Sequence, residues 1–460
     1  MGKLFGTDGV RGVANQDLTP DLAFRLGRCV GARLGVRHSG LDRPFVVIGR
    51  DTRRSGAMLE SALAAGLCSV GIDVCLLGVV PTPAVAWLAR RQGAGAGVMI
   101  SASHNPAPDN GIKIFSREGF KLPDAEEDAV EALLDAPADE LPRPTGSHLG
   151  QIELRPDLVD SYEEALCNLI PEGLADMKIA LDCAHGAAYA IAPRVFRALG
   201  AQVAILGDAP DGDNINAGVG STHLGALIEE VGQGGHQLGI AFDGDADRCL
   251  AVDAGGKVVD GDKIMWLCTR HLRQTGRLAS ADVVSTVMSN MGFEEAIGRE
   301  GGQVFRTRVG DRYVLEEMQR RGIRIGGEQS GHVIFLDDNT TGDGLVTALR
   351  LLAAIKAAGE PLGSLACGMP VYPQLLRNVR VGSVAGWQDS PDIQAAIRSA
   401  EERLKGAGRL VVRASGTEPL IRVMAEARDQ ALVEEVVDGL IAVITRTLLV
   451  GAADERSPVR

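Results

Sequence analysis

Strand-like and helical stretches alternate along this chain from about residue 45 to about residue 365, and this alternation constrains the fold more than any other feature. Helical stretches separate most of the short apolar runs, which favours parallel, doubly wound α/β sheets. The stretches form three successive series of similar layout, so we expect three related α/β domains. The apolar runs typical of buried strands occur at 45–49, 73–77, 97–100, 178–182, 202–206, 238–242, 283–287, 304–308 and 323–326.

The C-terminal part of the chain follows a different pattern. Strand-like stretches at 374–381 and 409–413 enclose a helical stretch at 390–405, and a strand-like stretch at 420–425 precedes a helical stretch at 430–447. We expect a small α+β domain here. The predicted fold class is α/β, with three related mixed α/β sheet domains and a C-terminal α+β domain. The predicted domains are 1–152, 153–254, 255–367 and 368–460.

Composition limits the kinds of partner and compartment. The 460 residues carry a net charge of −13, which argues against a nucleic-acid or anionic-membrane surface. The eight cysteines form no C-x-x-C pair, which is typical of a reduced protein rather than a disulfide or zinc scaffold. The N-terminus lacks the apolar core of a signal peptide, and the longest apolar stretch (74–89) is short for a membrane span. We expect a soluble, cytoplasmic protein.

The motif S-A-S-H-N-P at 101–106 directly follows a buried strand and places serine hydroxyls beside an imidazole. Serine is a weak nucleophile unless a base or a metal activates it, and His104 follows Ser103 directly. A covalent site and a simple polar turn are both compatible with this motif alone. P-loop, H-E-x-x-H and G-x-S-x-G motifs are absent from the sequence, which argues against nucleotide kinases, metalloproteases and α/β-hydrolases.

Three aspartates alternate with small residues in D-G-D-A-D-R at 243–248, just after another buried strand. In a loop freed by a glycine, three carboxylates can surround one cation, and hard oxygen ligands favour Mg²⁺. An EF-hand loop requires glycine at its sixth position and glutamate at its twelfth. These positions are Arg248 and Ala254 here, so an EF-hand does not fit. An acidic surface loop is the alternative, although three clustered carboxylates repel one another without a cation. Arg248 could neutralise a phosphate beside the metal.

Two further motifs indicate a sugar and a phosphate. In G-G-E-Q-S-G-H (326–332), Glu328 and Ser330 offer groups for vicinal hydroxyls or a hydroxyl–amine pair, although a glycine-rich turn explains the motif equally well. In R-A-S-G-T-E-P (413–419), with Arg422 beyond, hydroxyls, backbone N–H groups and arginines suit a phosphate, and an ordinary turn is the alternative. Arg11 is a weaker candidate for a phosphate contact, and Lys113 is a weak candidate because it is one of only eight lysines in an arginine-rich chain.

These motifs, in this order, resemble those of the α-D-phosphohexomutase superfamily over almost the whole chain. The resemblance implies three related α/β domains and a fourth α+β domain around one central cleft. Each domain is then expected to contribute one loop to the cleft: a phosphoserine loop, a metal loop, a sugar loop and a phosphate loop.

The resemblance also implies roles for individual residues. Ser103 matches the phosphorylated serine and, with the three aspartates, a ligand of one Mg²⁺ per chain. Arg11, His104, Lys113 and Arg248 match positions that assist proton transfer or charge stabilisation. The expected metal ligands are Ser103, Asp243, Asp245 and Asp247. The expected substrate contacts are Glu328, Ser330, Arg413, Ser415, Gly416, Thr417 and Arg422.

Finer details resemble the branch of bacterial phosphoglucosamine mutases. They are the opening F-G-T-D-G-V-R-G (5–12), S-A-S-H (101–104), N-I-N-A-G-V-G-S (214–221), V-G-D-R-Y-V (309–314) and Gly416. This branch implies interconversion of glucosamine 6-phosphate and glucosamine 1-phosphate for UDP-N-acetylglucosamine synthesis. It also implies a phosphoserine enzyme, with glucosamine 1,6-bisphosphate as intermediate and activator. The expected partner is a small phosphosugar, without nucleic acid or membrane, and a homodimer is compatible with the resemblance.

Three alternatives stay open at this point. The chain could be a phosphoglucomutase or phosphomannomutase of the same superfamily. It could be a phosphatase that uses Asp243 as nucleophile, since D-x-D motifs also occur in haloacid-dehalogenase-like enzymes. It could also be a phosphosugar sensor without catalysis, although Ser103 and the three aspartates argue against this.

Overall fold

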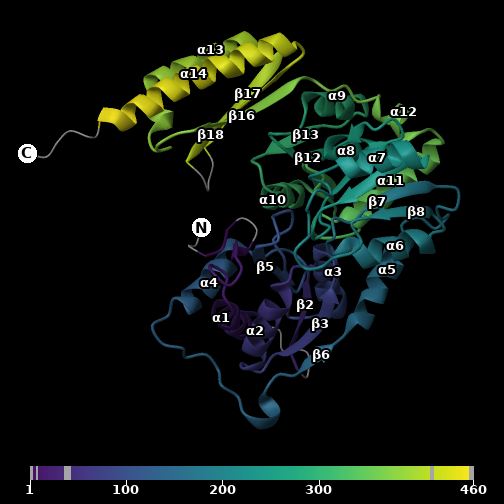
Figure 1. Ribbon diagram of the computed structural model, residues 1–460, viewed down its shortest axis with the longest axis vertical. Helices are drawn as coiled ribbons and strands as arrows, with labels where there is room; N and C mark the ends of the chain where they lie inside the picture. The colour runs from purple at the N-terminus through teal and green to yellow at the C-terminus, as the bar shows by residue number, and fades with distance from the viewer. Residues whose placement is uncertain (1–3, 7–8, 36–42, 415–418, 455–460) are drawn as a thin grey trace, which may run out of the picture. The chain divides into compact units, whose positions relative to one another are not determined.

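The computed structural model describes residues 4–6, 9–35, 43–414 and 419–454, and the strands of this part of the chain form four sheets (Figure 1). The chain forms two compact units. The first comprises residues 1–286 and 300–368 and contains three of the sheets, and the second comprises residues 287–299 and 369–460 and contains the fourth. The fold class predicted from the sequence, with mixed α/β sheets and a C-terminal α+β part, is confirmed. The predicted domain boundaries stay predictions.

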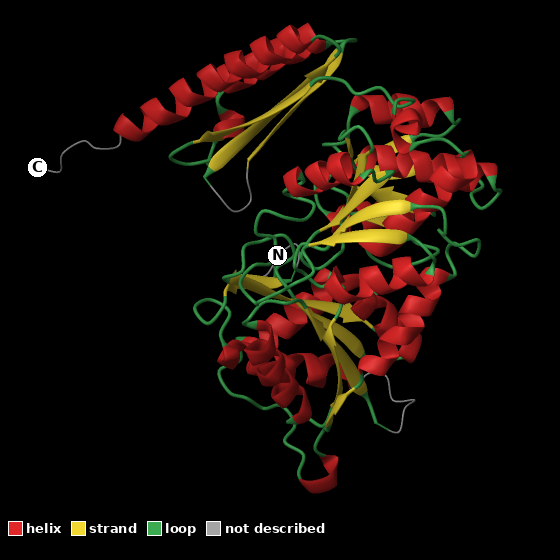
Figure 2. Cartoon of the chain, turned by 45° about the vertical axis from the view of Figure 1, so that its right-hand side comes forward, coloured by secondary structure: helices red, strands yellow, loops and turns green. Residues whose placement is uncertain are grey.

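The first sheet has the strand order β1-β5-β4-β2-β3-β6, in which β2, β3, β4 and β6 are parallel and β5 is antiparallel to β4 and β1. Its central strands form from continuous apolar runs because helices bury both faces (Figure 2). The elements are β1 (Val10–Val13), α1 (Pro20–Val30), β2 (Phe45–Arg50), α2 (Gly56–Cys68), β3 (Asp73–Val79), α3 (Thr82–Gln92), β4 (Ala96–Ile100), β5 (Asp109–Ser116), α4 (Asp124–Leu134) and β6 (Ile152–Leu154).

The second sheet has the order β11-β10-β9-β7-β8, with β7, β8 and β9 parallel and β10 antiparallel to β9. The third has the order β13-β12-β14-β15, with β15 antiparallel to β14. The elements of the second are α5 (Val159–Cys167), β7 (Lys178–Asp182), α6 (Ala188–Ala198), β8 (Gln202–Leu206), α7 (Gly225–Gly234), β9 (Leu238–Phe242), β10 (Cys249–Asp253) and β11 (Val258–Val259). Those of the third are α8 (Gly261–Gln274), β12 (Val283–Thr286), β13 (Val304–Thr307), α10 (Asp311–Arg321), β14 (Ile325–Gly327), β15 (Val333–Phe335), α11 (Gly344–Ala358) and α12 (Leu362–Ala366).

The second unit is an antiparallel sheet in the order β16-β18-β17, with two helices on one face (Figure 1, Figure 2). Helix α9 (Met291–Arg299) also belongs to this unit, where Glu426 accepts a hydrogen bond from the Met291 N–H (2.6 Å). The remaining elements are β16 (Gln374–Arg380), α13 (Pro391–Leu404), β17 (Gly408–Ala414), β18 (Leu420–Ala427) and α14 (Gln430–Asp454).

Each of the four predicted motifs lies in a connection between two antiparallel neighbours. These pairs are β4 and β5, β9 and β10, β14 and β15, and β17 and β18. The strand–helix alternation of the sequence did not indicate β5, β10 or β15, because a strand that returns directly after a loop breaks the alternation. The sheets are therefore mixed rather than purely parallel.

Side-chain caps fix where several helices begin. Asp343 accepts a hydrogen bond from the Val346 N–H at the start of α11 (3.0 Å), and Asp260 accepts one from the Lys263 N–H at the start of α8 (3.1 Å). No helix among the described residues combines the length and the apolar character that a membrane crossing requires.

Candidate active site

Ser103 lies in the loop after β4 and is 2% exposed. Its hydroxyl donates a hydrogen bond to Asp243 Oδ2 (2.7 Å), and its Oγ lies 3.4 Å from His104 Nδ1. The backbone φ of Ser103 is +53°, in the left-handed region that residues other than glycine rarely adopt. Ser103, the predicted phosphoserine, is thus in direct contact with Asp243, a predicted metal ligand. The two residues lie 140 positions apart in the sequence.

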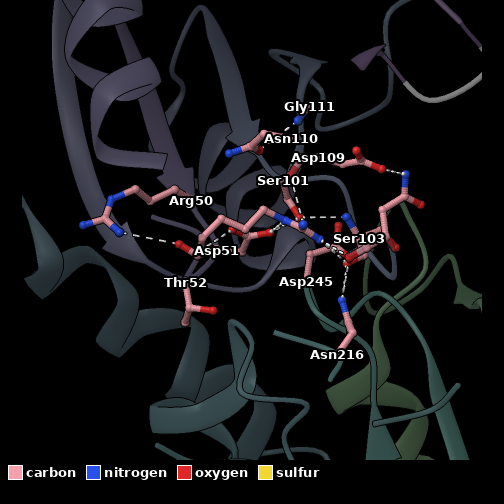
Figure 3. Close-up of polar contacts among 12 residues, drawn as sticks. Arg50, Asp51, Thr52, Ser101, Ser103, Asp109, Asn110, Gly111, Asn216 and Asp245 are labelled. Atoms are coloured by element: carbon pink, nitrogen blue, oxygen red, sulfur yellow. Dashed lines mark hydrogen bonds and ion pairs between the residues drawn. The ribbon is translucent and has the colours of Figure 1, made fainter. Parts of the chain in front are cut away.

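A buried ion pair fixes the backbone of this loop. The Arg53 guanidinium pairs with Asp51 (2.9 Å), and both side chains are fully buried. Arg53 also donates to the carbonyls of Ser103 (2.9 Å) and Asn105 (2.8 Å) and to two further carbonyls of the loop. Asp51 accepts a hydrogen bond from Ser101 (2.6 Å), whose Oγ accepts one from the Ser103 N–H (2.9 Å; Figure 3). The Ser101 hydroxyl therefore helps to fix the backbone of Ser103.

Asp243, Asp245 and Asp247 are buried, and their nearest carboxylate oxygens all lie within 4.8 Å of one another. Burial, reinforced by the charges of the other two aspartates, raises the pKa of Asp243 well above its usual value. Burial also acts to raise the pKa of Asp247, but Lys113, His332 and Arg248 outweigh it and lower this pKa. The loop can approach Ser103 because residue 244 is glycine: a Cβ there would lie 2.5 Å from the Ser103 carbonyl oxygen.

The donor set of this cluster fits a divalent cation. Three carboxylates converge, and Asp245 Oδ1 is buried without a hydrogen-bond partner among the described residues. Its Oδ2 accepts hydrogen bonds from Thr82 (2.6 Å) and Lys113 (2.8 Å), which fix the orientation of the carboxylate. Hard oxygens in this number are typical ligands of Mg²⁺.

We expect Mg²⁺ to stabilise the protein, because a cation that binds only the folded loop relieves the repulsion among the carboxylates. At a free Mg²⁺ concentration about 100 times Kd, one such site stabilises by about 2.7 kcal/mol. Differential scanning calorimetry with Mg²⁺ or EDTA measures the change in Tm. The Asp243→Asn variant should lose the Mg²⁺-dependent increase, whereas Asp208→Asn, at an exposed position, should keep it. An equal increase in both variants would place the cation elsewhere.

The structure brings the four predicted cationic or proton-transferring residues close to Ser103 and the aspartates. Lys113 is 1% exposed on β5 and lies 2.8 Å from Asp245 and 3.5 Å from Asp247. The Arg248 N–H donates to Asp243 (3.1 Å). Arg11 lies on β1 opposite Gly111 of β5. Burial, together with the charges of Arg248 and Arg11, lowers the pKa of His104 to about 4, so its imidazole is neutral at neutral pH.

The predicted sugar loop connects to the metal loop through His332. The Glu328 carboxylate accepts a hydrogen bond from the Gly310 N–H (3.1 Å), and Ser330 is exposed. His332 is buried, with Nδ1 3.5 Å from Asp247 and Nε2 3.7 Å from Asp311. Burial acts to lower the pKa of His332, but the charges of these two aspartates outweigh it and raise it to about 9.

The predicted phosphate loop belongs to the second unit. Arg413 of β17 and Arg422 of β18 are directly opposite each other in the antiparallel pair. Arg422 Nε is buried without a hydrogen-bond partner among the described residues. Like charges on opposed positions repel, so this pair favours a bound anion. The other three predicted contacts, Ser415, Gly416 and Thr417, lie outside the described residues.

Sequence reasoning missed the side chains that support these loops. They are Asp51, Arg53, Thr82, Asn216 and His332. Arg53 and Asp51 had one available signal, since the strand 45–49 runs directly into the charged sequence R-D-T-R-R (50–54). Asn216 and His332 stand inside quoted motifs, but their contacts with Ser103 and Asp247 span more than 80 positions of the sequence and could not be inferred from it.

Four sequence families match successive parts of the chain. They are phosphoglucomutase/phosphomannomutase α/β/α domain I at 2–140, domain II at 158–256, domain III at 260–372 and the C-terminal domain at 376–443. The chain is 54% identical over 440 residues to a phosphoglucosamine mutase of Moorella thermoacetica, covering 96% of this chain and 98% of the relative. It is also 54% identical over 445 residues to one of Desulforudis audaxviator, covering 97% and 98%.

Solved structures show the same fold. A phosphoglucomutase/phosphomannomutase family protein of Burkholderia thailandensis matches with a TM-score of 0.79 and 25% identity, covering 100% of this chain and 99% of that one. An N-acetylphosphoglucosamine mutase of Aspergillus fumigatus, in complex with GlcNAc-6P and magnesium, matches with a TM-score of 0.69 and 19% identity, covering 97% and 96%.

The chain therefore belongs to the phosphoglucomutase/phosphomannomutase family, the α-D-phosphohexomutases, and it is an enzyme of the isomerase class. The curated relatives at 52–54% identity are phosphoglucosamine mutases, which confirms the branch that the sequence motifs indicated.

Proposed function

We propose that this enzyme interconverts glucosamine 6-phosphate and glucosamine 1-phosphate through phosphorylated Ser103 and glucosamine 1,6-bisphosphate, on the route to UDP-N-acetylglucosamine. The observation that carries the proposal is the contact of the Ser103 hydroxyl with Asp243, inside a buried cluster of three aspartates. This contact supports the proposal, because a hydroxyl oxygen that could carry a phosphoryl group lies beside carboxylates that suit a cation. The identity of the relatives supports the amino sugar as substrate.

The first transfer moves the phosphoryl group from Ser103 Oγ to O1 of the 6-phosphate sugar. The P–O bond to Ser103 breaks and a P–O bond to the sugar forms. The O1 proton passes to a base, and the departing Ser103 oxygen takes up a proton to become the hydroxyl. The proposed acceptor is His104, whose ring lies 3.4 Å from Ser103 Oγ and is neutral at neutral pH, although its pKa of about 4 makes it a weak base. In the second transfer Ser103 Oγ gives its proton to a base and takes the 6-phosphoryl group of the reoriented bisphosphate. The P–O6 bond breaks, and the 6-oxygen takes up a proton. The products are glucosamine 1-phosphate and the original phosphoenzyme.

Positive charge around Ser103 balances the charge of the transferring group. Ser103, Asp243, Asp245 and Asp247 would hold Mg²⁺, which would supply electrostatic stabilisation of the phosphoryl oxygens. Lys113 holds two of the aspartates in place, and Arg248 adds a cation beside them. Glu328 and Ser330 are proposed to contact the sugar hydroxyls, and the loop 413–422 to hold the phosphate that does not react.

The relative rates on three sugar phosphates test the proposal. The measurement is kcat/KM for glucosamine, glucose and mannose 6-phosphates with Mg²⁺ and a trace of the bisphosphate. A preference of several orders of magnitude for the amino sugar is expected. Equal or faster turnover of glucose or mannose phosphates would keep the fold and the phosphoserine chemistry, but would replace the proposed substrate by that of a phosphoglucomutase or phosphomannomutase.

Arg422→Ala should raise KM about 10- to 100-fold and slow turnover, because a charged hydrogen bond to a phosphate contributes about 1.5–3 kcal/mol. Phosphorylation of Ser103 should persist, since it does not depend on this side chain. Arg377→Ala is the matched control: Arg377 stands opposite Val423, on the other face of the same sheet, beside Asp438 of α14. Equal KM values for the two variants would refute the proposed role of Arg422 in phosphate binding.

A further inference from the structure

Asn216 lies in the loop between β8 and α7 and is 7% exposed. Its side-chain nitrogen donates hydrogen bonds to the carbonyls of Ser103 (2.9 Å) and Asn105 (3.2 Å). Figure 3 shows the amide of Asn216 directed at Ser103. Because only the nitrogen of the amide can donate, two carbonyl acceptors determine its orientation. Asn216 thus connects the loop of the second sheet to the phosphoserine loop of the first.

The same two carbonyls also accept hydrogen bonds from Arg53, at 2.9 Å and 2.8 Å. Arg53 follows β2 of the first sheet, so the backbone at Ser103 and Asn105 is held from both sides. Asn216 itself has a φ of +61°, which asparagine tolerates better than most residues, and its N–H donates to the Ala184 carbonyl (2.8 Å). The donor therefore stands on a backbone that is itself fixed.

The catalytic cycle makes this contact important. The hydrogen bond from the Ser103 hydroxyl to Asp243 requires the hydroxyl proton, and this proton is absent whenever Ser103 carries a phosphoryl group. The hydrogen bonds to the Ser103 carbonyl do not depend on the chemical state of the side chain. They can keep the loop at one distance from the aspartates in both states.

We propose that Asn216 is a positioning residue, which holds the Ser103 backbone against the metal loop so that the phosphoryl group stays aligned for transfer to the sugar. The inference rests on the proposed phosphoserine chemistry. Packing at the same carbonyl agrees with this role: the Ser103 carbonyl oxygen lies so close to residue 244 that only glycine fits there. Loss of the Asn216 donor leaves the Ser103 and Asn105 carbonyls with hydrogen bonds from Arg53 of the first sheet alone.

The test uses the full-length enzyme with Asn216→Gly, which removes the donor and suits a positive φ, and Asn216→Asp, which is isosteric and cannot donate. Thr52→Val is the matched control. Thr52 donates a hydrogen bond to the His185 carbonyl (2.6 Å), which also connects the first and second sheets but does not involve residues 103–109. A general weakening of the contact between the two sheets would affect all three variants alike.

Both Asn216 variants should lower kcat about 100-fold, because a misplacement of about 1 Å at the reacting group has an effect of this size, while KM changes by less than about threefold. In single turnovers of phosphorylated enzyme, the ratio of bisphosphate to released inorganic phosphate should fall. Thr52→Val should keep the parental kcat and ratio within about threefold. If the Asn216 variants matched Thr52→Val in kcat and in this ratio, the positioning role would be wrong.

Hydrogen–deuterium exchange separates this inference from the proposed function. Amides of residues 101–109 should exchange faster in Asn216→Gly than in the parent and in Thr52→Val, whatever reaction the enzyme catalyses. If the parent enzyme had no mutase activity and Asn216→Gly still exchanged faster than the parent, the proposed function would be refuted and the role of the contact would stand. Unchanged exchange in both Asn216 variants would refute the anchoring by Asn216.

Discussion

Ser103→Ala should abolish mutase turnover, with a loss of kcat on the order of 10⁴- to 10⁶-fold, the effect typical of removing a nucleophile. Alanine cannot accept a phosphoryl group, and the remaining groups of the site cannot replace this covalent step. The position is buried and small, so the variant should fold. Intact-mass spectrometry after incubation with a 1,6-bisphosphate measures phosphorylation, and a coupled assay measures turnover.

Ser116→Ala is the control for this variant. Ser116 ends β5, and its hydroxyl donates to Glu118 rather than to the aspartates, so phosphorylation and turnover should stay near the parental values. If the Ser103→Ala variant were still phosphorylated, the phosphoserine assignment would be wrong. If the Asp243→Asn variant then lost its phosphorylation, the phosphatase alternative with an aspartyl nucleophile would gain support.

Arg53→Met should lower the free energy of unfolding by about 3–5 kcal/mol, the effect of breaking a fully buried ion pair. The variant leaves the Asp51 carboxylate without its cation, and it removes hydrogen bonds from the carbonyls of Ser103 and Asn105. Methionine has a similar length and no donor, so the effect reports on the guanidinium. Urea denaturation followed by circular dichroism measures the change.

The pH dependence of this variant gives a second signature. Burial raises the pKa of Asp51 even beside Arg53, and removal of Arg53 should raise it further. An acid with a raised pKa in the folded state loses stability as pH rises above its unfolded pKa, about 3.9. The parent loses stability in the same way up to its own raised folded pKa of Asp51. The deficit relative to the parent should therefore grow with pH only above that pKa, and level off above the still higher pKa of Asp51 in the variant. A deficit that shrank with rising pH between these two pKa values would contradict the ion-pair explanation.

Arg54→Met is the control, because Arg54 is the next residue and pairs with Asp213 at the surface. Both of these side chains are more than 60% exposed, and solvent screens an ion pair of this kind. We expect little change in stability. Equal losses for Arg53→Met and Arg54→Met would show that burial of the ion pair at Arg53 is not the cause.

The sequence determined those parts of the protein whose signal is local. Continuous apolar runs such as 45–49 and 238–242 predict buried strands, since a strand covered on both faces needs apolar residues at every position. The spacing of Asp243, Asp245 and Asp247 after such a strand predicts a cation loop. The four motifs in their order were sufficient to indicate the family.

Only the tertiary structure decided how these local pieces meet. The antiparallel returns of β5, β10 and β15 were not apparent, because a short loop between two strands has no helix to mark it. The contacts of Ser103 with Arg53, Asn216 and Asp243 span 50, 113 and 140 positions of the sequence. Such contacts depend on how whole sheets pack, and the identity of one residue does not encode the position of a partner so far away. The sequence therefore supplied the chemical groups, and packing decided which of them support one another.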